Sequence, residues 1–269
     1  MRLTVILTTY NSPEWLEKVL WGYQAQTHPA AEIIIADDGS ATATRERIER
    51  MRTATGLPLQ HLWQEDKGFR KCRILNKAIV VAQSPYLVFS DGDCIPRRDF
   101  LAVHAREARP GCYLSGSYNK LPLGTSRAIS PADIQAQRCF DWRWLRAHGM
   151  TCQRKHLKLV VSPQQAPWLN RIAFTRCRFK GSNGSVWRDD AIRVNGFDER
   201  MVWGGLDREF GVRLINAGLR PKHVRYDAIV VHLDHPRGYL DPERVRWNKS
   251  LIREVARRKQ VATAHGIAQ

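Results

Sequence analysis

The sequence of 269 residues has no long apolar run, no internal repeat and no low-complexity segment. Its apolar runs fall short of the roughly 20 residues that span a bilayer, which argues against a transmembrane helix. The first stretch, MRLTVILTTYN, is too short for a signal peptide and no small-residue cleavage site follows it. A first β-strand is the better interpretation of that stretch.

Cysteines are few and scattered, and no two of them form a CxxC pair. This spacing argues against a zinc site made of thiolates. Because no secretory signal is recognised, we expect free thiols in a reducing cytosol. The six cysteines are Cys72, Cys94, Cys112, Cys139, Cys152 and Cys177.

Acidic residues are scarce, with 26 Asp and Glu against 43 Lys and Arg, for a formal net charge of +17. Apolar residues make up 43% of the chain, which is ordinary for a globular protein. The basic excess lies partly in residues 127–188 and partly in residues 237–259. It predicts a polyanionic partner, such as nucleic acid, anionic lipid or a phosphorylated glycan. The alternative is a surface that merely keeps the protein in solution.

Strand and helix patterns alternate through the N-terminal part of the chain. The helix at 12–26 has Ser12 as its predicted N-cap and Pro13 at its first position. The run at 32–40 is apolar throughout, which favours a central parallel strand. Such alternation predicts an α/β fold with a doubly wound parallel sheet. The predicted strands are 3–11, 32–40, 57–64 and 86–94, and the predicted helices are 12–26, 42–55 and 69–83.

The later part of the chain is less regular. Residues 112–179 are rich in Arg, Trp and Lys and are interpreted as an inserted, partly helical segment on the acceptor side. A strand is predicted at 227–235, and the last residues are expected to form a basic helical tail.

Polar residues follow three of the predicted parallel strands. They are Thr8–Asn11, Asp37–Ser40 and Asp91–Asp93. Ligands of open parallel sheets bind beyond the carboxyl ends of the strands, so we expect these residues to share one edge and one ligand.

The motif Asp91-Gly92-Asp93 follows the apolar strand YLVFS. Two carboxylates so close together repel each other unless a positive charge lies between them. They could hold one hard divalent cation, which prefers oxygen ligands, while Gly92 would let the backbone approach a phosphate. A surface turn is the alternative for an isolated DxD, but the strand before it favours the cation site.

Three other motifs carry candidate functional groups. Asp37-Asp38-Gly39-Ser40 could accept hydrogen bonds from a base or a ribose, or it could simply cap a helix. In VWGGLDREFGVRL, residues 202–214, Asp207 could act as a general base, or it could complement the helix dipole together with Glu209. In VVHLDH, residues 230–235, His232 could complete a metal site or be structural.

The order and spacing of these motifs resemble family 2 glycosyltransferases with the GT-A fold. The matching segments are TTYN, ADDGS, SDGDC, GSNGSVWRDDAIRVNGFDE, WGGLDREFGVRL and VVHLDH. The C-terminal part resembles the galactosyltransferase-type region of bacterial chondroitin polymerase and of polypeptide N-acetylgalactosaminyltransferases. The resemblance covers roughly residues 3–107 and 176–235. It implies a Rossmann-like, mostly parallel central sheet flanked by helices.

The resemblance also implies roles for individual residues. Asp207 matches the catalytic base, and the implied metal ligands are Asp91, Asp93 and His232 for Mn²⁺ or Mg²⁺. The implied nucleotide-binding residues are Thr9, Tyr10, Asn11, Asp37, Asp38, Lys67, Arg73, Asn76, Asp91 and Gly92. The implied sugar- and acceptor-binding residues are Gly181, Asn183, Trp203, Gly204, Gly205 and Glu209. Leu206 stands where many relatives have a Glu that contacts a sugar, so the sugar specificity does not carry over.

The resemblance implies a catalytic domain at 1–235, with a nucleotide-binding half at 1–107 and an acceptor-binding half at 108–235, and then the basic tail at 236–269. The expected enzyme is an inverting, metal-dependent glycosyltransferase. It would use a nucleotide-sugar donor, by family frequency a UDP-sugar, and a glycan or glycolipid acceptor of lipopolysaccharide or polysaccharide synthesis.

The basic charge favours a cytoplasmic protein at the anionic inner face of a membrane. The alternatives are a nucleic-acid-binding protein, which no recognised motif supports, and an inactive GT-A interaction module, which the intact carboxylates disfavour. We therefore expect no nucleic acid partner, and the oligomeric state is not predicted.

Overall fold

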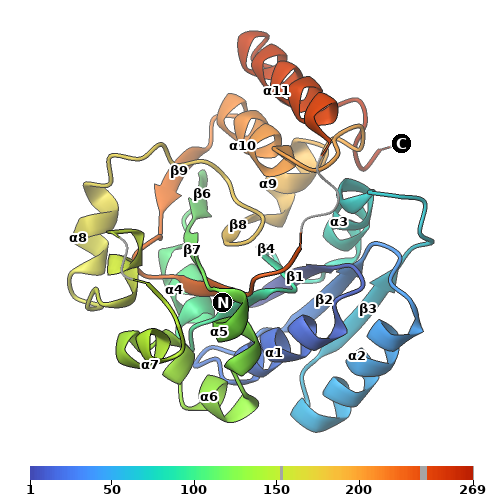
Figure 1. Ribbon diagram of the computed structural model, residues 1–269. Helices are drawn as coiled ribbons and strands as arrows, with labels where there is room; N and C mark the ends of the chain where they lie inside the picture. Colours follow the sequence, from blue (N-terminus) through green and yellow to red (C-terminus); the bar gives the residue numbers. More distant parts are fainter. Residues whose placement is uncertain (152–153, 237–240, 269) are drawn as a thin grey trace.

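The computed structural model describes residues 1–151, 154–236 and 241–268. A seven-stranded mixed sheet forms the centre of the molecule (Figure 1). Its strands, in spatial order, are β3 (Leu59–Trp63), β2 (Glu32–Asp37), β1 (Leu3–Thr9), β4 (Tyr86–Asp91), β8 (Gly184–Trp187), β6 (Cys112–Ser115) and β9 (Arg220–His223). A smaller sheet consists of β5 (Cys94–Pro96), β10 (Ile229–His232) and β7 (Ser117–Lys120).

Helices cover both faces of the central sheet, as a doubly wound fold requires. The helices that precede the inserted segment are α1 (Pro13–Gln24), α2 (Thr42–Thr55), α3 (Lys71–Val81) and α4 (Phe100–Glu107). Those of the inserted segment are α5 (Leu123–Ala128), α6 (Pro131–Gln135), η1 (Arg138–Phe140), α7 (Trp142–Ala147), η2 (Arg154–Leu159) and α8 (Ala166–Arg171). The last helices are α9 (Arg188–Arg193), α10 (Leu206–Asn216) and α11 (Pro242–Arg257).

The central strands are buried on both faces, which explains their continuous apolar sequences. Val5 and Leu7 of β1 pack in the core beneath α1, α2 and α4, whereas Ile6 packs in the opposite core beneath α3, α9 and α10. This alternation follows from the two-residue period of a strand. The predicted doubly wound sheet is therefore confirmed.

The strand register brings the polar strand ends together. β1 pairs in parallel with β2 and β4, and Thr9 lies opposite Asp37 while Thr8 lies opposite Asp91. The expectation that these residues share one edge of the sheet is confirmed. Any ligand at this edge can touch the ends of several strands at once.

The second sheet brings the late histidine to the same place. β10 pairs antiparallel with β5, and His232 lies opposite Cys94, the residue after Asp93. The predicted strand at 86–94 is thus two strands, β4 and β5, because the chain turns at Asp91-Gly92-Asp93. This turn is what places the last aspartate beside β10.

Several predicted strands extend a few residues beyond the observed ones. The strands predicted at 3–11, 32–40 and 227–235 are shorter, because their polar ends form the turns of the site. Ser12 precedes α1, but its side chain makes no capping hydrogen bond. The insert is partly helical as predicted, and α5 to α8 lie on the side of the molecule away from β3 (Figure 1).

Within the described residues, no helix is long and apolar enough to cross a bilayer. Cys72, Cys94, Cys112, Cys139 and Cys177 are free thiols, and Cys152 lies outside the described residues. The helix predicted in the tail is α11, which packs against α10.

Candidate active site

A lysine pairs with the first aspartate of the DxD motif. The Nζ atom of Lys71, in the first turn of α3, lies 2.7 Å from Oδ1 of Asp91, and the Thr8 hydroxyl donates to the same oxygen at 2.7 Å. Burial alone would lower the pKa of Lys71, but Asp91 and Asp207 outweigh it and hold that pKa above its ordinary value. Lys71 therefore supplies the positive charge that the two neighbouring carboxylates require.

Asp207 approaches this group from α10. Its side chain is only partly exposed, and a Cβ built on Gly181 would lie 2.7 Å from its Oδ1. That oxygen is buried and has no hydrogen-bond partner. Burial raises the pKa of Asp207, and the charge of Lys71 offsets part of the rise. A carboxylate with a raised pKa and an unused oxygen is suited to accept a proton.

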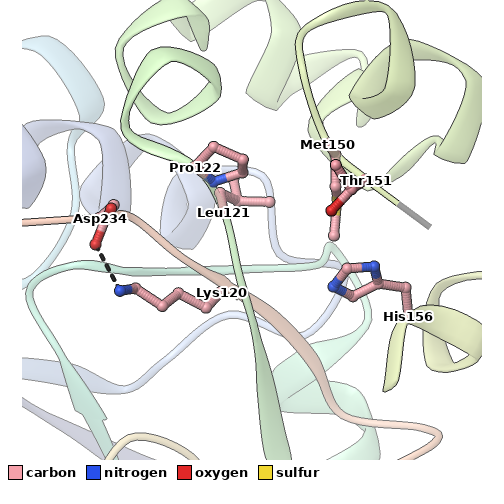
Figure 2. A pocket seen from close by; sticks show the side chains of 7 residues that line it. All are labelled: Lys120, Leu121, Pro122, Met150, Thr151, His156 and Asp234. Carbon is pink, nitrogen blue, oxygen red and sulfur yellow. Dashed lines mark ion pairs between the residues drawn. The ribbon is translucent and has the colours of Figure 1, made fainter. Parts of the chain in front are cut away.

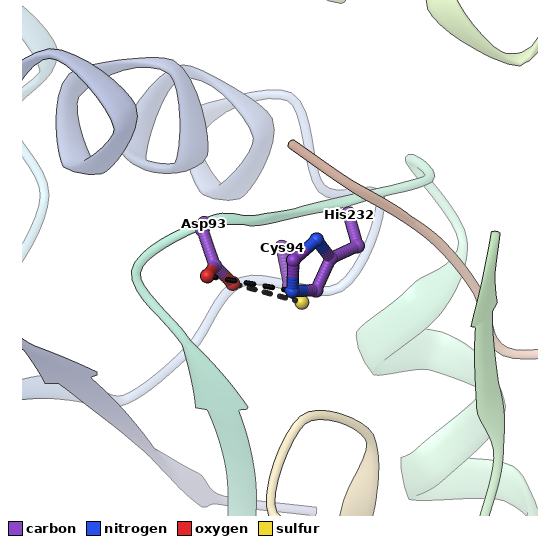
Figure 3. A group of neighbouring side chains, drawn as sticks. All are labelled: Asp93, Cys94 and His232. Carbon is purple, nitrogen blue, oxygen red and sulfur yellow. Dashed lines mark hydrogen bonds and ion pairs between the residues drawn. The ribbon is translucent and has the colours of Figure 1, made fainter. Parts of the chain in front are cut away.

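The second aspartate of the motif faces two imidazoles. Nε2 of His235 lies 3.0 Å and Nε2 of His232 lies 3.5 Å from Oδ2 of Asp93. The two rings stack, and the Cys94 thiol donates to the other oxygen of Asp93 at 3.3 Å (Figure 3). Burial would raise the pKa of Asp93, but the hydrogen bond from His235 and the charges of both histidines bring it below its ordinary value.

These side chains have the composition of a site for a hard divalent cation. The ligand atoms of Asp93, Cys94 and His232 lie within 4.8 Å of one another, and Nδ1 of His232 is buried without a partner. Burial keeps the pKa of the Cys94 thiol well above its ordinary value. Carboxylate and imidazole donors with a protonated thiol fit Mn²⁺ or Mg²⁺ better than a soft thiophilic ion. Asp93 and His232, with Asp91 nearby, are the residues that would hold it.

The predicted nucleoside residues lie at the ends of β1 and β2. Asp37 is fully buried, 2.9 Å from His61 Nε2, and accepts from the Ser40 backbone. Asp38 accepts from Gln64 at 2.6 Å, and its burial raises its pKa. These interactions fix the carboxylates at the edge of the sheet.

The remaining residues of this edge differ in exposure. Tyr10 is half exposed and its hydroxyl donates to Asp66 at 2.9 Å. The hydroxyl of Thr9 is buried and has no hydrogen-bond partner. Asn11 has a positive φ angle, and its side-chain oxygen accepts a hydrogen bond from the N–H of Ala41. Gly92 donates its N–H to the Thr8 carbonyl at 2.8 Å.

The structure does not bring three of the predicted side chains to this site. The side-chain amide of Asn76 donates to the Phe197 carbonyl and accepts from the Phe197 N–H. It therefore holds α3 to the loop before α10. The amide of Asn183 is fully buried and donates to the carbonyls of Ser117 and Ala228.

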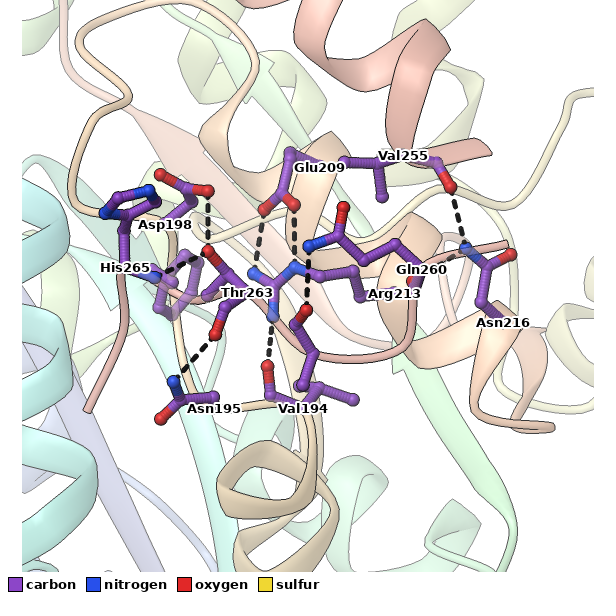
Figure 4. Close-up of polar contacts among 12 residues, drawn as sticks. Val194, Asn195, Asp198, Glu209, Arg213, Asn216, Val255, Gln260, Thr263 and His265 are labelled. Carbon is purple, nitrogen blue, oxygen red and sulfur yellow. Dashed lines mark hydrogen bonds and ion pairs between the residues drawn. The ribbon is translucent and has the colours of Figure 1, made fainter. Parts of the chain in front are cut away.

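Glu209 is the third of these side chains. It forms a bidentate pair with Arg213, and both side chains are fully buried (Figure 4). The guanidinium of Arg213 also donates to the Val194 carbonyl, which ties α10 to the end of α9. Glu209 therefore fixes the helix that carries Asp207 and has no free oxygen pair for a sugar.

We predict that Glu209→Gln destabilises the fold by about 3–5 kcal/mol, because it leaves the buried guanidinium of Arg213 without its counter-charge. Urea unfolding followed by circular dichroism measures the change. Glu243→Gln, in the exposed pair with Arg246, is the matched control and should cause no measurable loss. Equal midpoints for the two variants would contradict this role.

The remaining predicted residues come from the segment between β3 and α3, from α3 itself and from the segment before α10. Lys67 is exposed and pairs with Glu65 at 2.8 Å, and Arg73 is exposed on α3. Gly204 and Gly205 have positive φ angles of 103° and 116°, and both pack against α11. Trp203 lines a hollow of about 200 Å³ together with Phe69, Val202, Asp241 and Arg244.

Two residues of the site were not among the predicted ones. Lys71 precedes the buried Leu75 and Ala78 by four and seven residues, so helical spacing could have placed it on the inner face of α3. His235 is the last residue of VVHLDH, a motif in which the sequence singles out only His232. The sequence predicts a strand there, but it does not show that the chain after His232 turns so that His235 faces Asp93.

A second hollow, of about 220 Å³, opens between β7 and the inserted segment (Figure 2). Lys120 and Asp234 form an ion pair of 2.8 Å on one side, and Met150, Thr151 and His156 come from the insert on the other. Lys120 lies opposite His232 in the β7–β10 register, so this hollow borders the candidate metal ligands.

The geometry can now be compared with known proteins. Residues 4–118 match the model of glycosyl transferase family 2, and residues 170–236 match that of the N-terminal domain of galactosyltransferase. The N-terminal part of the chain is thus similar to glycosyl transferase family 2. The predicted resemblance is therefore confirmed, and both matched segments contribute carboxylates to the site.

The chain is similar to validoxylamine A glucosyltransferase of Streptomyces hygroscopicus, with 27% identity over 87% of the chain and 56% of the relative. It is 24% identical to the chondroitin synthase of Escherichia coli over 87% of the chain and 35% of that protein. The chain thus spans about half, or less, of the length of these curated relatives.

The fold agrees with that of solved glycosyltransferases. The mannosyltransferase PcManGT from Pyrobaculum calidifontis, solved with GDP-Man and Mn²⁺, superposes with a TM-score of 0.59 at 22% identity, over 88% of this chain and 58% of that one. The chain therefore has the predicted GT-A fold.

Proposed function

We propose that this chain transfers a sugar from a nucleotide-sugar donor to a hydroxyl group of a glycan or glycolipid acceptor, with inversion at the anomeric carbon. The observation that carries this proposal is the gathering of Asp91 and Asp207 around Lys71, with Asp93 and two histidines beside them. Two of the acids belong to the nucleotide-side sheet and the third comes from α10. Such a site can hold a diphosphate on one side and activate a hydroxyl on the other.

The donor would lie along the carboxyl ends of β1, β2 and β4. Asp38 would accept a hydrogen bond from the nucleoside, whereas Asp37 is fully buried and would hold the turn through Ser40 and His61. The diphosphate would lie near Gly92, whose backbone packs closely on Thr8 and Thr9. A divalent cation held by Asp93 and His232 would neutralise the negative charge on that diphosphate. Lys71 holds Asp91 in place and lowers the repulsion between the acids and the phosphates.

Asp207 is the proposed base. Its carboxylate accepts the proton of the acceptor hydroxyl while that oxygen forms a bond to the anomeric carbon. The bond between that carbon and the phosphate oxygen breaks in the same step, and its electron pair leaves with the nucleoside diphosphate. Because one displacement from the opposite face occurs, the anomeric configuration inverts.

The comparisons support the reaction class but leave the donor open. A glucosyltransferase and a chondroitin synthase are among the relatives, and the mannosyltransferase structure holds GDP-Man with Mn²⁺. We propose a UDP-sugar donor and Mn²⁺ or Mg²⁺. The net charge of +17 supports an anionic acceptor of polysaccharide or lipopolysaccharide synthesis, at the inner face of a membrane.

The test is a screen of UDP-, GDP- and dTDP-sugars for hydrolysis, with Mn²⁺ and with a chelator. We expect one nucleotide class to be hydrolysed and the chelator to stop the reaction. Absence of hydrolysis and of nucleotide binding with every donor would contradict the proposal. Product stereochemistry, read by NMR once a donor is known, tests inversion.

A further inference from the structure

Four exposed arginines lie together without acidic partners. Arg176 and Arg178 precede β8, Arg208 follows the proposed base on α10, and Arg253 is on α11. No ion pair joins any of them to a carboxylate in the part of the chain that the structure describes. Other arginines of the chain do have such partners, for example Arg47.

Packing of the backbone explains why these arginines meet. A Cβ built on Gly211 of α10 would lie 2.7 Å from Cβ of Phe179, so the segment before β8 runs directly along α10. Phe179 is buried between them, which leaves Arg178 exposed beside Arg208. On the other side α11 packs on α10 and contributes Arg253.

The arginines are close enough to affect one another. The pKa of Arg208 lies below its ordinary value. The largest cause is partial desolvation of its side chain, and the charges of Arg178, Arg176 and Arg253 add to the effect. Gathered like charges cost free energy, and an anion between them would remove that cost. Guanidinium groups are the side chains best suited to bind phosphate through paired hydrogen bonds.

We infer that Arg176, Arg178, Arg208 and Arg253 form a binding site for a phosphate or diphosphate group of the acceptor. The site adjoins the base, because Arg208 follows Asp207 and the same segment contacts Asp207 through Gly181. An anionic group held there would position a nearby hydroxyl of the same molecule at Asp207. This assignment to the acceptor rests on the proposed function.

The phosphate could be carried by a lipid or by a water-soluble glycan, and the apolar residues just before the arginines bear on the first of these. Trp168, Ile172 and Phe174 are exposed, and the side chain of Phe174 is wholly accessible. An apolar surface next to arginines suits a phosphate carried on a lipid, whereas the arginines alone would bind a water-soluble phosphorylated glycan. Both sources present the same phosphate chemistry.

The test measures pyrophosphate binding by calorimetry at low salt, with a chelator present so that no metal recruits the anion to the donor site. Arg176→Gln/Arg208→Gln should weaken binding about tenfold or more, since two charge-assisted pairs are lost. The matched control is Arg45→Gln/Arg50→Gln on α2, which removes the same charge from exposed positions of a remote helix. The control should bind as the unchanged protein does.

The inference is overturned if pyrophosphate does not bind, or if both double variants lose affinity equally, since net charge would then account for the binding. Binding to phosphatidic acid vesicles that is lost in both Arg176→Gln/Arg208→Gln and Trp168→Ser/Phe174→Ser would support the site with a lipid source. Pyrophosphate binding without vesicle binding would support it with a soluble source.

The proposed function is scored separately in the same variants. Donor hydrolysis should be unchanged in the control variant Arg45→Gln/Arg50→Gln, because the donor site is formed by other residues. If the unchanged protein hydrolyses no donor but binds pyrophosphate through the cluster, the proposed function fails and the anion site remains.

Discussion

Asp207→Asn is expected to lower the rate of sugar transfer by about 10²–10⁴-fold while nucleotide binding is retained. The amide has nearly the shape of the carboxylate, but it cannot accept the proton of the attacking hydroxyl. The Oδ1 atom of Asp207 is buried against Gly181, whose backbone favours the ionised carboxylate, and an amide oxygen can accept from the same N–H. The loss should therefore appear in the rate and not in the folding.

The measurement is single-turnover transfer with the donor found in the screen, together with calorimetry of nucleoside diphosphate binding. Asp189→Asn removes the same charge from an exposed position on α9 and is the matched control. Full turnover by Asp207→Asn would show that another group takes the proton. Loss of both binding and turnover would instead indicate a structural role for Asp207.

The rate should also depend on pH in a defined direction. Burial raises the pKa of Asp207 above its ordinary value, and the base acts only when it is ionised. Transfer should be constant well above that pKa and fall as the pH decreases through it, approaching tenfold per pH unit. A rate that rises on acidification would contradict the assignment.

The N-terminal half of the fold could be predicted because its signals are local. Continuous apolar strands, strand-helix alternation and polar strand ends each depend on a few neighbouring residues, and parallel pairing then places the ends together. Thr8 and Asp91 are far apart in sequence, yet their pairing across β1 and β4 follows from the topology alone.

The orientation of side chains could not be predicted in the same way. Asn183 and Glu209 lie within motifs of the family, but their partners, His104 and Ser117 for the amide and Arg213 for the acid, make them structural supports. A motif shows which residues lie near a site. Only the packing shows which of them face it.

The ion pair of Lys71 distinguishes the two aspartates of the DxD motif as ligands for a cation. In the described structure this lysine pairs with Asp91, whereas Asp93 pairs with the two histidines. The two acids of the motif therefore have different partners. Asp93, whose ion-pair partners are the two imidazoles, is the acid from which we expect a cation to gain most.

Asp93→Asn is accordingly expected to weaken Mn²⁺ binding by at least about a hundredfold, because even the loss of a residue behind a metal ligand costs 10–100-fold. Titration of Mn²⁺ followed by electron paramagnetic resonance, with nucleoside diphosphate present, measures this. Cys94→Ala is the matched neighbour, and since burial keeps the thiol protonated it should change the affinity little. A larger loss in Cys94→Ala than in Asp93→Asn would show that the thiol is the principal ligand and that the site selects a softer ion. Equal binding by all three proteins would place the ion away from β4 and β10, and the proposed donor site with it.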